Sequence, residues 1–379
     1  MSAESKPPAT SSRRVSLWIG SILLLLLVSL AVVGLFEVAL RIWWPQQERV
    51  IAGNRGAKGD AGMVDSAVGW SLRPGAQVTT KNPEYTVDYQ ISPQGFRDQV
   101  THAVPKPPNV FRVLLVGDSF TYGIGSSYPD VWGVILERQL AARGLSADIV
   151  KAGVPAYDTR TEFLTMQKLV PEYQPDLVVM AFLPNDLFTN TPLGAVPSAV
   201  DEEVHGHTFS LQSINLLQRI LFHSDNIYTR LYLLTARRQY FSEPPDRLVA
   251  GQYAITEDLL VQASRYADSQ HCKFAVLCIP QEFQVLVKAD GMRFAGIDVD
   301  AIDRRLGAFA AEHRFPWLPV MDTMVEKYRS RKADLYYRLD GHLTPLGNHV
   351  VGDWLTEQMV QLYGGAIAQV SHPGEPTPR

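Results

Sequence analysis

The sequence predicts an α/β fold with a mostly parallel sheet, preceded by one N-terminal transmembrane helix. Two patterns carry that prediction. From about residue 111 onward, short apolar runs of strand length alternate with segments of helical periodicity, as in a parallel sheet with crossover helices. Near the N-terminus, residues 15–36 form a run of 22 residues without a charge. As a helix, that run would rise about 33 Å and cross a bilayer.

The composition excludes several classes of protein. The chain has 379 residues, of which 46% are hydrophobic and 20% charged, so wholesale disorder is excluded. A formal net charge of −4 gives no basic footprint for nucleic acid. Cys272 and Cys278 flank one predicted strand, about 20 Å apart, and cannot form a disulfide. His205 and His207 lie near acidic residues, but a solvated loop is the favoured interpretation, and we expect neither a metal nor a cofactor.

The N-terminal apolar run is interpreted as an uncleaved anchor. A cleaved secretory signal is the alternative, but its apolar region usually spans about 7–15 residues and ends at small residues. We therefore expect a cytoplasmic tail at 1–14 and a transmembrane anchor at 15–42. Glu37 and Arg41 lie one helical turn apart in that anchor and can pair.

The rest of the chain is predicted to form one large domain and its tether. Residues 43–107 show little helical periodicity and are predicted to be a connector with one short strand at 85–91. A proline-rich stretch then marks the start of the large domain, 108–363. Residues 190–250 interrupt the alternation of strands and helices and are predicted to be an insertion. Residues 364–379 hold three prolines and little apolar material, which predicts a flexible tail.

Apolar periodicity places the elements of the large domain. Strands are predicted at 111–116, 147–151, 177–182 and 273–279, and helices at 130–143, 160–170, 254–268 and, within the insertion, near 214–234. The final helix is predicted to begin with Thr344 as N-cap and Pro345 at its first position, where both residue types are favoured.

Polar signals fall at the ends of these elements. Gly117-Asp118-Ser119-Phe120 follows the first strand, and ligands of open α/β sheets bind outside the carboxyl ends of the strands. A serine there is placed to act as a nucleophile, although a turn capped by Asp118 and Ser119 is the structural alternative. Asn185 follows the third strand, where its side chain could stabilise an oxyanion or form an Asx turn.

Asp340 and His342 precede the final helix. Two residues apart on an extended segment, they point to the same side. An aspartate that accepts from histidine Nδ1 fixes the tautomer and leaves Nε2 free to take a serine proton. The order of serine, asparagine and Asp-His, each at a strand end or helix start, favours a catalytic interpretation of all three.

These residues resemble the sequence blocks of the SGNH (GDSL-type) hydrolase superfamily. The resemblance covers about 108–363, and Gln94-Gly95-Phe96-Arg97 is similar to a lead-in of membrane-anchored members. It implies a three-layer α/β/α fold. It also implies that Ser119 is the nucleophile, that His342 is the general base and that Asp340 orients the histidine.

The resemblance further implies an oxyanion hole. Its donors would be the backbone N–H of Ser119, the side chain of Asn185 and a backbone N–H of the glycine block, which in the family usually resembles Asn-x-Gly-x-x-Gly. Here Gly153 keeps the first glycine, and Ala156 stands at the usual donor position. An alanine N–H can still donate there, provided that its φ is negative.

Asp340 and His342 are two positions apart, whereas most members have three. The shorter spacing resembles proteins that O-acetylate exported polysaccharides. We expect a membrane-anchored serine esterase that cleaves small acetyl-type esters, including esters on exported glycans, through an acyl-enzyme. A polysaccharide O-acyltransferase on the same triad is the first alternative, and a catalytically silent glycan-binding or scaffold protein is the second.

The expected location follows from the anchor and the resemblance together. The N-terminus is expected in the cytoplasm, and the large domain is expected in the periplasm or at the cell surface. Expected partners are an ester-bearing substrate, such as an O-acylated polysaccharide, and the lipid bilayer.

Overall fold

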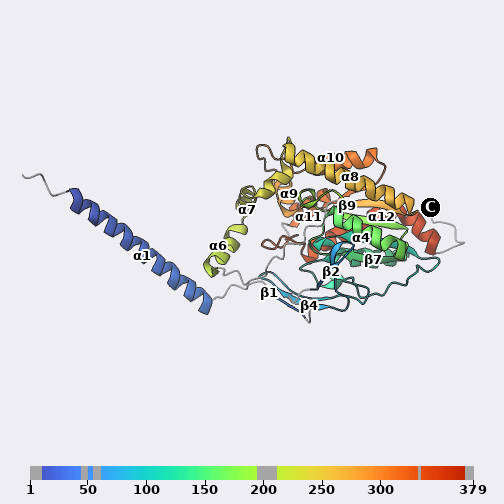
Figure 1. Cartoon of the computed structure of the whole chain (residues 1–379), viewed down its shortest axis with the longest axis horizontal. Helices are drawn as coiled ribbons and strands as arrows, with labels where there is room; N and C mark the ends of the chain where they lie inside the picture. The colour runs from blue at the N-terminus through green and yellow to red at the C-terminus, as the bar shows by residue number, and fades with distance from the viewer. Residues whose placement is uncertain (1–10, 44–49, 54–60, 194–210, 332–333, 372–379) are drawn as a thin grey trace, which may run out of the picture. The chain divides into compact units, whose positions relative to one another are not determined.

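The computed structural model describes residues 11–43, 50–53, 61–193, 211–331 and 334–371. The chain divides into two compact units. The first consists of Met1–Gln47 and Gly206–Leu221, and the second of Glu48–His205 and Phe222–Arg379. Figure 1 shows the elements of both.

The first unit contains helix α1 (Ser11–Trp43), blue in Figure 1, and most of helix α6 (Gln212–Phe222). Over Trp18–Trp43, α1 is long and apolar enough to cross a membrane. Every side chain from 18 to 36 is exposed, which is the arrangement expected of a helix that faces lipid. The predicted pair is confirmed, since Arg41 Nε donates to Glu37 Oε1 at 2.9 Å.

The second unit is built on a five-stranded sheet in which every neighbouring pair is parallel. Its strand order is β10-β9-β8-β6-β7. The strands are β6 (Phe111–Gly117), β7 (Ala147–Gly153), β8 (Leu177–Phe182), β9 (Lys273–Cys278) and β10 (Trp317–Pro319). The four predicted strands are confirmed. The fifth, β10, was not predicted because three residues are too few to show a periodicity.

Helices cover both faces of this sheet, so the predicted three-layer α/β/α fold is confirmed. They are α3 (Trp132–Ala142), α4 (Thr159–Tyr173), α8 (Arg247–Ser269), α9 (Glu282–Ala289), α10 (Ala301–Glu312), α11 (Met321–Arg331) and α12 (Pro345–Ser371). Strand β6, which lies between β8 and β7, is buried throughout, and its side chains alternate between two cores. Leu114 and Val116 pack with α4, α8 and α10, whereas Val113 and Leu115 pack with α3, α11 and α12.

Shorter helices connect these elements. They are α2 (Ser119–Tyr122), η1 (Tyr128–Asp130), α5 (Asp186–Thr189), α7 (Asp225–Tyr232) and η2 (Ala236–Phe241). The single helical stretch predicted near 214–234 is therefore two helices, α6 and α7, which break at His223 and Ser224.

The predicted connector with one strand is wrong. The strand predicted at 85–91 exists, but four others precede it. The five are β1 (Val50–Gly53), β2 (Gly62–Asp65), β3 (Gly69–Leu72), β4 (Gln77–Lys81) and β5 (Thr86–Gln90). They form two antiparallel sheets, β1-β4-β5 and β2-β3. We call residues 50–53 and 61–92 the N-terminal β region.

The N-terminal β region and the large domain share one hydrophobic cluster. Val78, Val87 and Tyr89 are buried in one cluster with Tyr122 and Val154, which follow β6 and β7. Strands of four or five residues alternate too briefly to be recognised in the sequence. Their burial makes the region part of the enzyme unit and not a tether.

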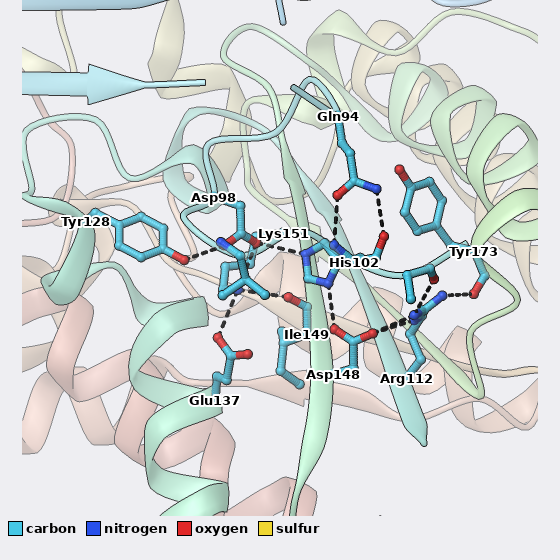
Figure 2. A network of polar contacts seen from close by, with 12 residues as sticks. Gln94, Asp98, His102, Arg112, Tyr128, Glu137, Asp148, Ile149, Lys151 and Tyr173 are labelled. Carbon is cyan, nitrogen blue, oxygen red and sulfur yellow. Dashed lines mark hydrogen bonds and ion pairs between the residues drawn. The ribbon is translucent and has the colours of Figure 1, made fainter. Parts of the chain in front are cut away.

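A buried polar network joins the segment that follows the N-terminal β region to strands β6 and β7 of the five-stranded sheet. Figure 2 shows His102 between two carboxylates, with Nδ1 2.6 Å from Asp148 and Nε2 3.1 Å from Asp98. Arg112 on β6 donates to Asp148 at 2.7 Å, and Lys151 on β7 donates to Asp98 at 2.9 Å. Burial disfavours a charged imidazole, but hydrogen bonds to the two carboxylates outweigh it and raise the pKa of His102.

The chain remains helical beyond the predicted domain end. A flexible tail was predicted from residue 364, but α12 continues to Ser371. Ile367 is fully buried and Val370 packs against the same core, so apolar contacts hold the helix through Gly364 and Gly365. Residues 372–379 lie outside the described part of the chain.

Candidate active site

Ser119 stands where strand β6 gives way to helix α2. Strand β6 ends at Gly117, and a Cβ there would lie 1.9 Å from Thr121 Oγ1, so the turn requires glycine. Asp118 caps α2 by accepting from Phe120 N at 2.8 Å. Asp118 therefore caps the helix, as the structural alternative predicted. Ser119 is not a cap, because it is the first residue of the helix.

The structure brings the predicted serine, histidine and aspartate together. Ser119 Oγ lies 2.8 Å from His342 Nε2, and His342 Nδ1 is hydrogen-bonded to Asp340 Oδ1. The ring of Phe120 packs against the imidazole with centroids 5.1 Å apart. With its Nδ1 proton donated to Asp340, the histidine can accept the serine proton at Nε2.

The N-terminal β region supplies hydrogen bonds to Asp340, a role that no local sequence pattern predicted. Asn82 Nδ2 and Tyr85 Oη each donate to Asp340 Oδ2 at 3.0 Å. Glu84 accepts the backbone N–H groups of Leu339 and Asp340 at 3.0 and 2.9 Å. Both oxygens of the Asp340 carboxylate are therefore hydrogen-bonded, Oδ1 to the histidine and Oδ2 to the N-terminal β region.

The glycine block, which begins at Gly153, packs closely against helix α2. Val154 N donates to Gly117 O at 2.9 Å, which joins the ends of β6 and β7. A Cβ at Gly153 would lie 2.3 Å from Tyr122 N, so this position also requires glycine. Donation by the Ala156 N–H was expected only with a negative φ, and this condition is not met, because the φ of Ala156 is +66°. The left-handed conformation costs a residue with a Cβ about 1–2 kcal/mol.

Asn185 lies between β8 and α5 with its side chain only loosely held. It stands at the N-cap position of α5 but makes no capping hydrogen bond with its side chain. Its Nδ2 donates to Asp186 Oδ1 at 3.4 Å, and its Oδ1 accepts from Gln281 Nε2 at 3.5 Å. Both contacts are long, so the amide N–H groups remain available to a substrate oxygen.

Asp118, which precedes the serine, is one of three buried carboxyl groups that interact electrostatically, the others being Glu162 and Asp186. Burial raises the pKa of Asp118 to about 6. Burial and mutual repulsion raise the pKa of both Glu162 and Asp186. Burial and repulsion thus disfavour the ionised forms of Glu162 and Asp186 beside Asp118.

Other sequence candidates lie away from the triad. Cys272 and Cys278 are both buried and unpaired, and burial raises the pKa of the Cys272 thiol to about 11. His205 and His207 lie outside the described residues, so the structure does not place them. Within the described ranges, no group of three or more histidine, cysteine or acidic side chains could hold a metal ion.

The model of the GDSL-like lipase/acylhydrolase family matches residues 115–350. No curated protein matches the chain. The chain is similar to a crystal structure of a G-D-S-L family lipolytic protein from Veillonella parvula, at 12% identity and a TM-score of 0.41, covering 67% of this chain and 100% of that one.

Two further solved structures are similar at the same level. One is an acetyl xylan esterase, at 13% identity and a TM-score of 0.40, covering 65% of this chain and 99% of that one. The other is a psychrotrophic esterase from a Pseudoalteromonas species, at 10% identity and a TM-score of 0.38, covering 67% of this chain and 98% of that one.

Proposed function

The chain belongs to the GDSL-like lipase/acylhydrolase family and is an ester-bond hydrolase, and on that premise we propose that it is a membrane-anchored serine esterase. Its substrates are small acetyl-type esters, among them esters on exported glycans. The observation that carries the proposal is the 2.8 Å separation of Ser119 Oγ and His342 Nε2, with Asp340 on the far side of the imidazole.

In the proposed reaction, His342 Nε2 takes the proton of Ser119 as Oγ attacks the ester carbonyl carbon. Asp340 stabilises the imidazolium that forms. The carbonyl oxygen becomes an oxyanion, for which the donors are the Ser119 N–H and the Asn185 amide. Ala156 is left out of this set because its φ of +66° does not meet the condition for donation. Collapse of this intermediate breaks the bond to the alcohol, which leaves with the proton from His342, and the acyl group remains on Ser119.

Water completes the proposed cycle. His342 takes a proton from the water as it attacks the acyl-enzyme, and the carboxylic acid leaves when Ser119 regains its proton. In the alternative transferase reaction, a sugar hydroxyl replaces the water. The two-residue spacing of Asp340 and His342 favours keeping that alternative.

The proposed location has α1 as the anchor, the N-terminus in the cytoplasm and the enzyme unit in the periplasm or at the cell surface. The length and apolar surface of Trp18–Trp43 support the anchor. Basic residues both precede the uncharged run at 15–36 (Lys6, Arg13 and Arg14) and follow it (Arg41, Arg49 and Arg55). The proposed orientation therefore rests on the resemblance to membrane-anchored family members and not on a charge bias.

The esterase proposal is tested with 4-nitrophenyl acetate and the full-length protein in detergent. We expect turnover by the wild type and its loss in Ser119→Ala. Ser127→Ala is the matched control, because that hydroxyl binds Asp130 on the exposed helix η1 and has no place in the reaction. Equal rates for wild type and Ser119→Ala would remove the esterase proposal. Faster turnover with added oligosaccharide, together with acetylated sugar as a product, would favour the transferase.

A further inference from the structure

The first unit contains a second apolar surface besides α1. Helix α6 exposes Ile214, Leu217 and Ile220, with exposed fractions of 57%, 54% and 61%. At intervals of three residues these side chains share one face of the helix. Asn215 lies about 200° around the helix from Leu217 and belongs to the opposite, polar side. Helix α6 is therefore amphipathic, and its apolar face has no cover within the described residues of its own unit.

Helix α6 is fastened to α1 through one carboxylate. Glu37 accepts the backbone N–H groups of Gln212 at 2.8 Å and Ser213 at 3.0 Å, and also the Ser213 hydroxyl at 3.0 Å. These bonds satisfy donors that the start of a helix leaves free, and the negative charge suits the helix dipole. Glu37 and Leu40 are the only buried residues among the described side chains of α1.

The position of Glu37 along α1 indicates where α6 begins. The 19 residues from Trp18 to Phe36 rise about 28 Å, close to the hydrocarbon thickness of a bilayer, about 30 Å. Glu37 therefore falls at the boundary between hydrocarbon and headgroups, where a paired carboxylate is tolerated. A helix that starts at this carboxylate starts at the membrane surface.

We propose that α6 is an interfacial helix that lies in the membrane surface beside the end of α1, with Ile214, Leu217 and Ile220 in the lipid. This inference rests on the proposed membrane anchor. Lipid is the occupant of the apolar face because the helix begins at the end of a span whose surface is itself exposed and apolar. An amphipathic helix in this position buries its apolar side about 5–10 Å into the headgroup and acyl boundary. The chain would thus touch the membrane twice, once at α1 and again at α6.

Depth-dependent quenching in vesicles tests this inference. Full-length variants Leu217→Cys, Asn215→Cys and Leu30→Cys are labelled with a nitrobenzoxadiazole fluorophore and reconstituted in phosphatidylcholine vesicles that contain doxyl-labelled lipid. Wild type is the labelling control, since Cys272 and Cys278 are both buried. We expect the label at 217 to be quenched several-fold more than the label at 215, and Leu30 to be quenched by a deep doxyl group.

The outcomes separate the inference from the anchor. Quenching at Leu30 but not at Leu217 would overturn the interfacial helix, leave the anchor intact and indicate that protein covers the apolar face. No quenching at Leu30 would overturn the anchor and the interfacial helix together. Glu37→Ala is expected to reduce quenching at 217 and leave it unchanged at 30, because α6 loses its tie to α1. Retained hydrolysis of 4-nitrophenyl acetate shows that each variant is folded, and Ile220→Cys replaces Leu217→Cys if the latter is inactive.

Discussion

The two sides of the candidate site are built by different parts of the chain. Ser119, Gly153 and Asn185 stand at or just beyond the carboxyl ends of β6, β7 and β8, three neighbouring strands of one parallel sheet. On the other side, Asp340 receives hydrogen bonds from Asn82 and Tyr85 of the N-terminal β region. The serine side thus follows from the topology of the large domain, whereas the aspartate side depends on a region added before it.

This difference bears on the short Asp-His spacing. Asp340 and His342, two positions apart, belong to one loop, in which Gly341 has a φ of +87°. That loop has an external support, because Glu84 accepts two of its backbone N–H groups. The N-terminal β region therefore supplies contacts that keep the aspartate behind the imidazole.

Asp340→Asn should have the largest effect on the aspartate side. An amide in place of the carboxylate favours the wrong histidine tautomer. The same aspartate-to-asparagine change in the triad of a serine protease lowers kcat about 10⁴-fold. We expect a loss of that order in kcat for 4-nitrophenyl acetate. An Asp340→Asn enzyme with wild-type kcat would show that Asp340 does not act on His342.

Asn185→Ala is the corresponding change on the serine side. Removal of one oxyanion donor costs about 10²–10³-fold in kcat. We expect a loss within that range with little change in KM, since the donor acts on charge that develops in the transition state. A rise in KM with unchanged kcat would instead assign Asn185 to substrate binding.

Tyr85→Phe and Asn82→Ala test the contribution of the N-terminal β region. Each removes one donor to Asp340 Oδ2 and leaves the triad residues in place, and a small misplacement can cost up to about 10²-fold. We expect kcat to fall by about tenfold or more, and the acidic limb of the pH–rate profile to move to higher pH, because the less solvated carboxylate holds the imidazolium more strongly.

Tyr337→Phe is the matched control for that prediction. Its ring packs against Tyr85 with centroids 4.9 Å apart, but its hydroxyl donates to Gly125 O and not to Asp340. The control should keep the wild-type pH–rate profile. Identical pH–rate profiles for Tyr85→Phe and wild type would mean that the N-terminal β region has only a structural role.

The network of Figure 2 should affect stability with no effect on catalysis at neutral pH. The pKa of His102 is raised above its ordinary value of 6.5, so its contribution is complete below that pH and is lost as the pH rises through the raised value. We expect the free energy of unfolding in urea to fall with rising pH in the wild type. His102→Gln should cost about 3 kcal/mol at pH 6, with little left of that pH dependence.

His349→Gln provides the matched control for the network. His349 pairs with Asp130 at 3.3 Å, and both side chains are more than a third exposed. Such a pair contributes at most about 1 kcal/mol, so this variant should unfold nearly as the wild type does. An equal loss in both variants would contradict a special role for His102.

The same contrast explains what could be predicted from the sequence. The strands of the large domain are long, buried and apolar, and Ser119, Asn185 and His342 stand beside element ends that periodicity and capping residues mark. Tyr85 could not be found in this way, because its partner Asp340 is 255 positions away and the strands around it are short. The end of α12 was missed because the burial of Ile367 is a tertiary contact that no local signal announces.

Covalent labelling of the serine tests the central claim most directly. The full-length enzyme is incubated with an organophosphate ester that transfers a phosphoryl group to activated serines, and the digested protein is analysed by mass spectrometry. We predict one stoichiometric adduct on the peptide that contains Ser119, its absence in Ser119→Ala, and much slower labelling in His342→Ala. An unlabelled wild-type protein that is folded, or an adduct on another serine, would contradict the proposed nucleophile.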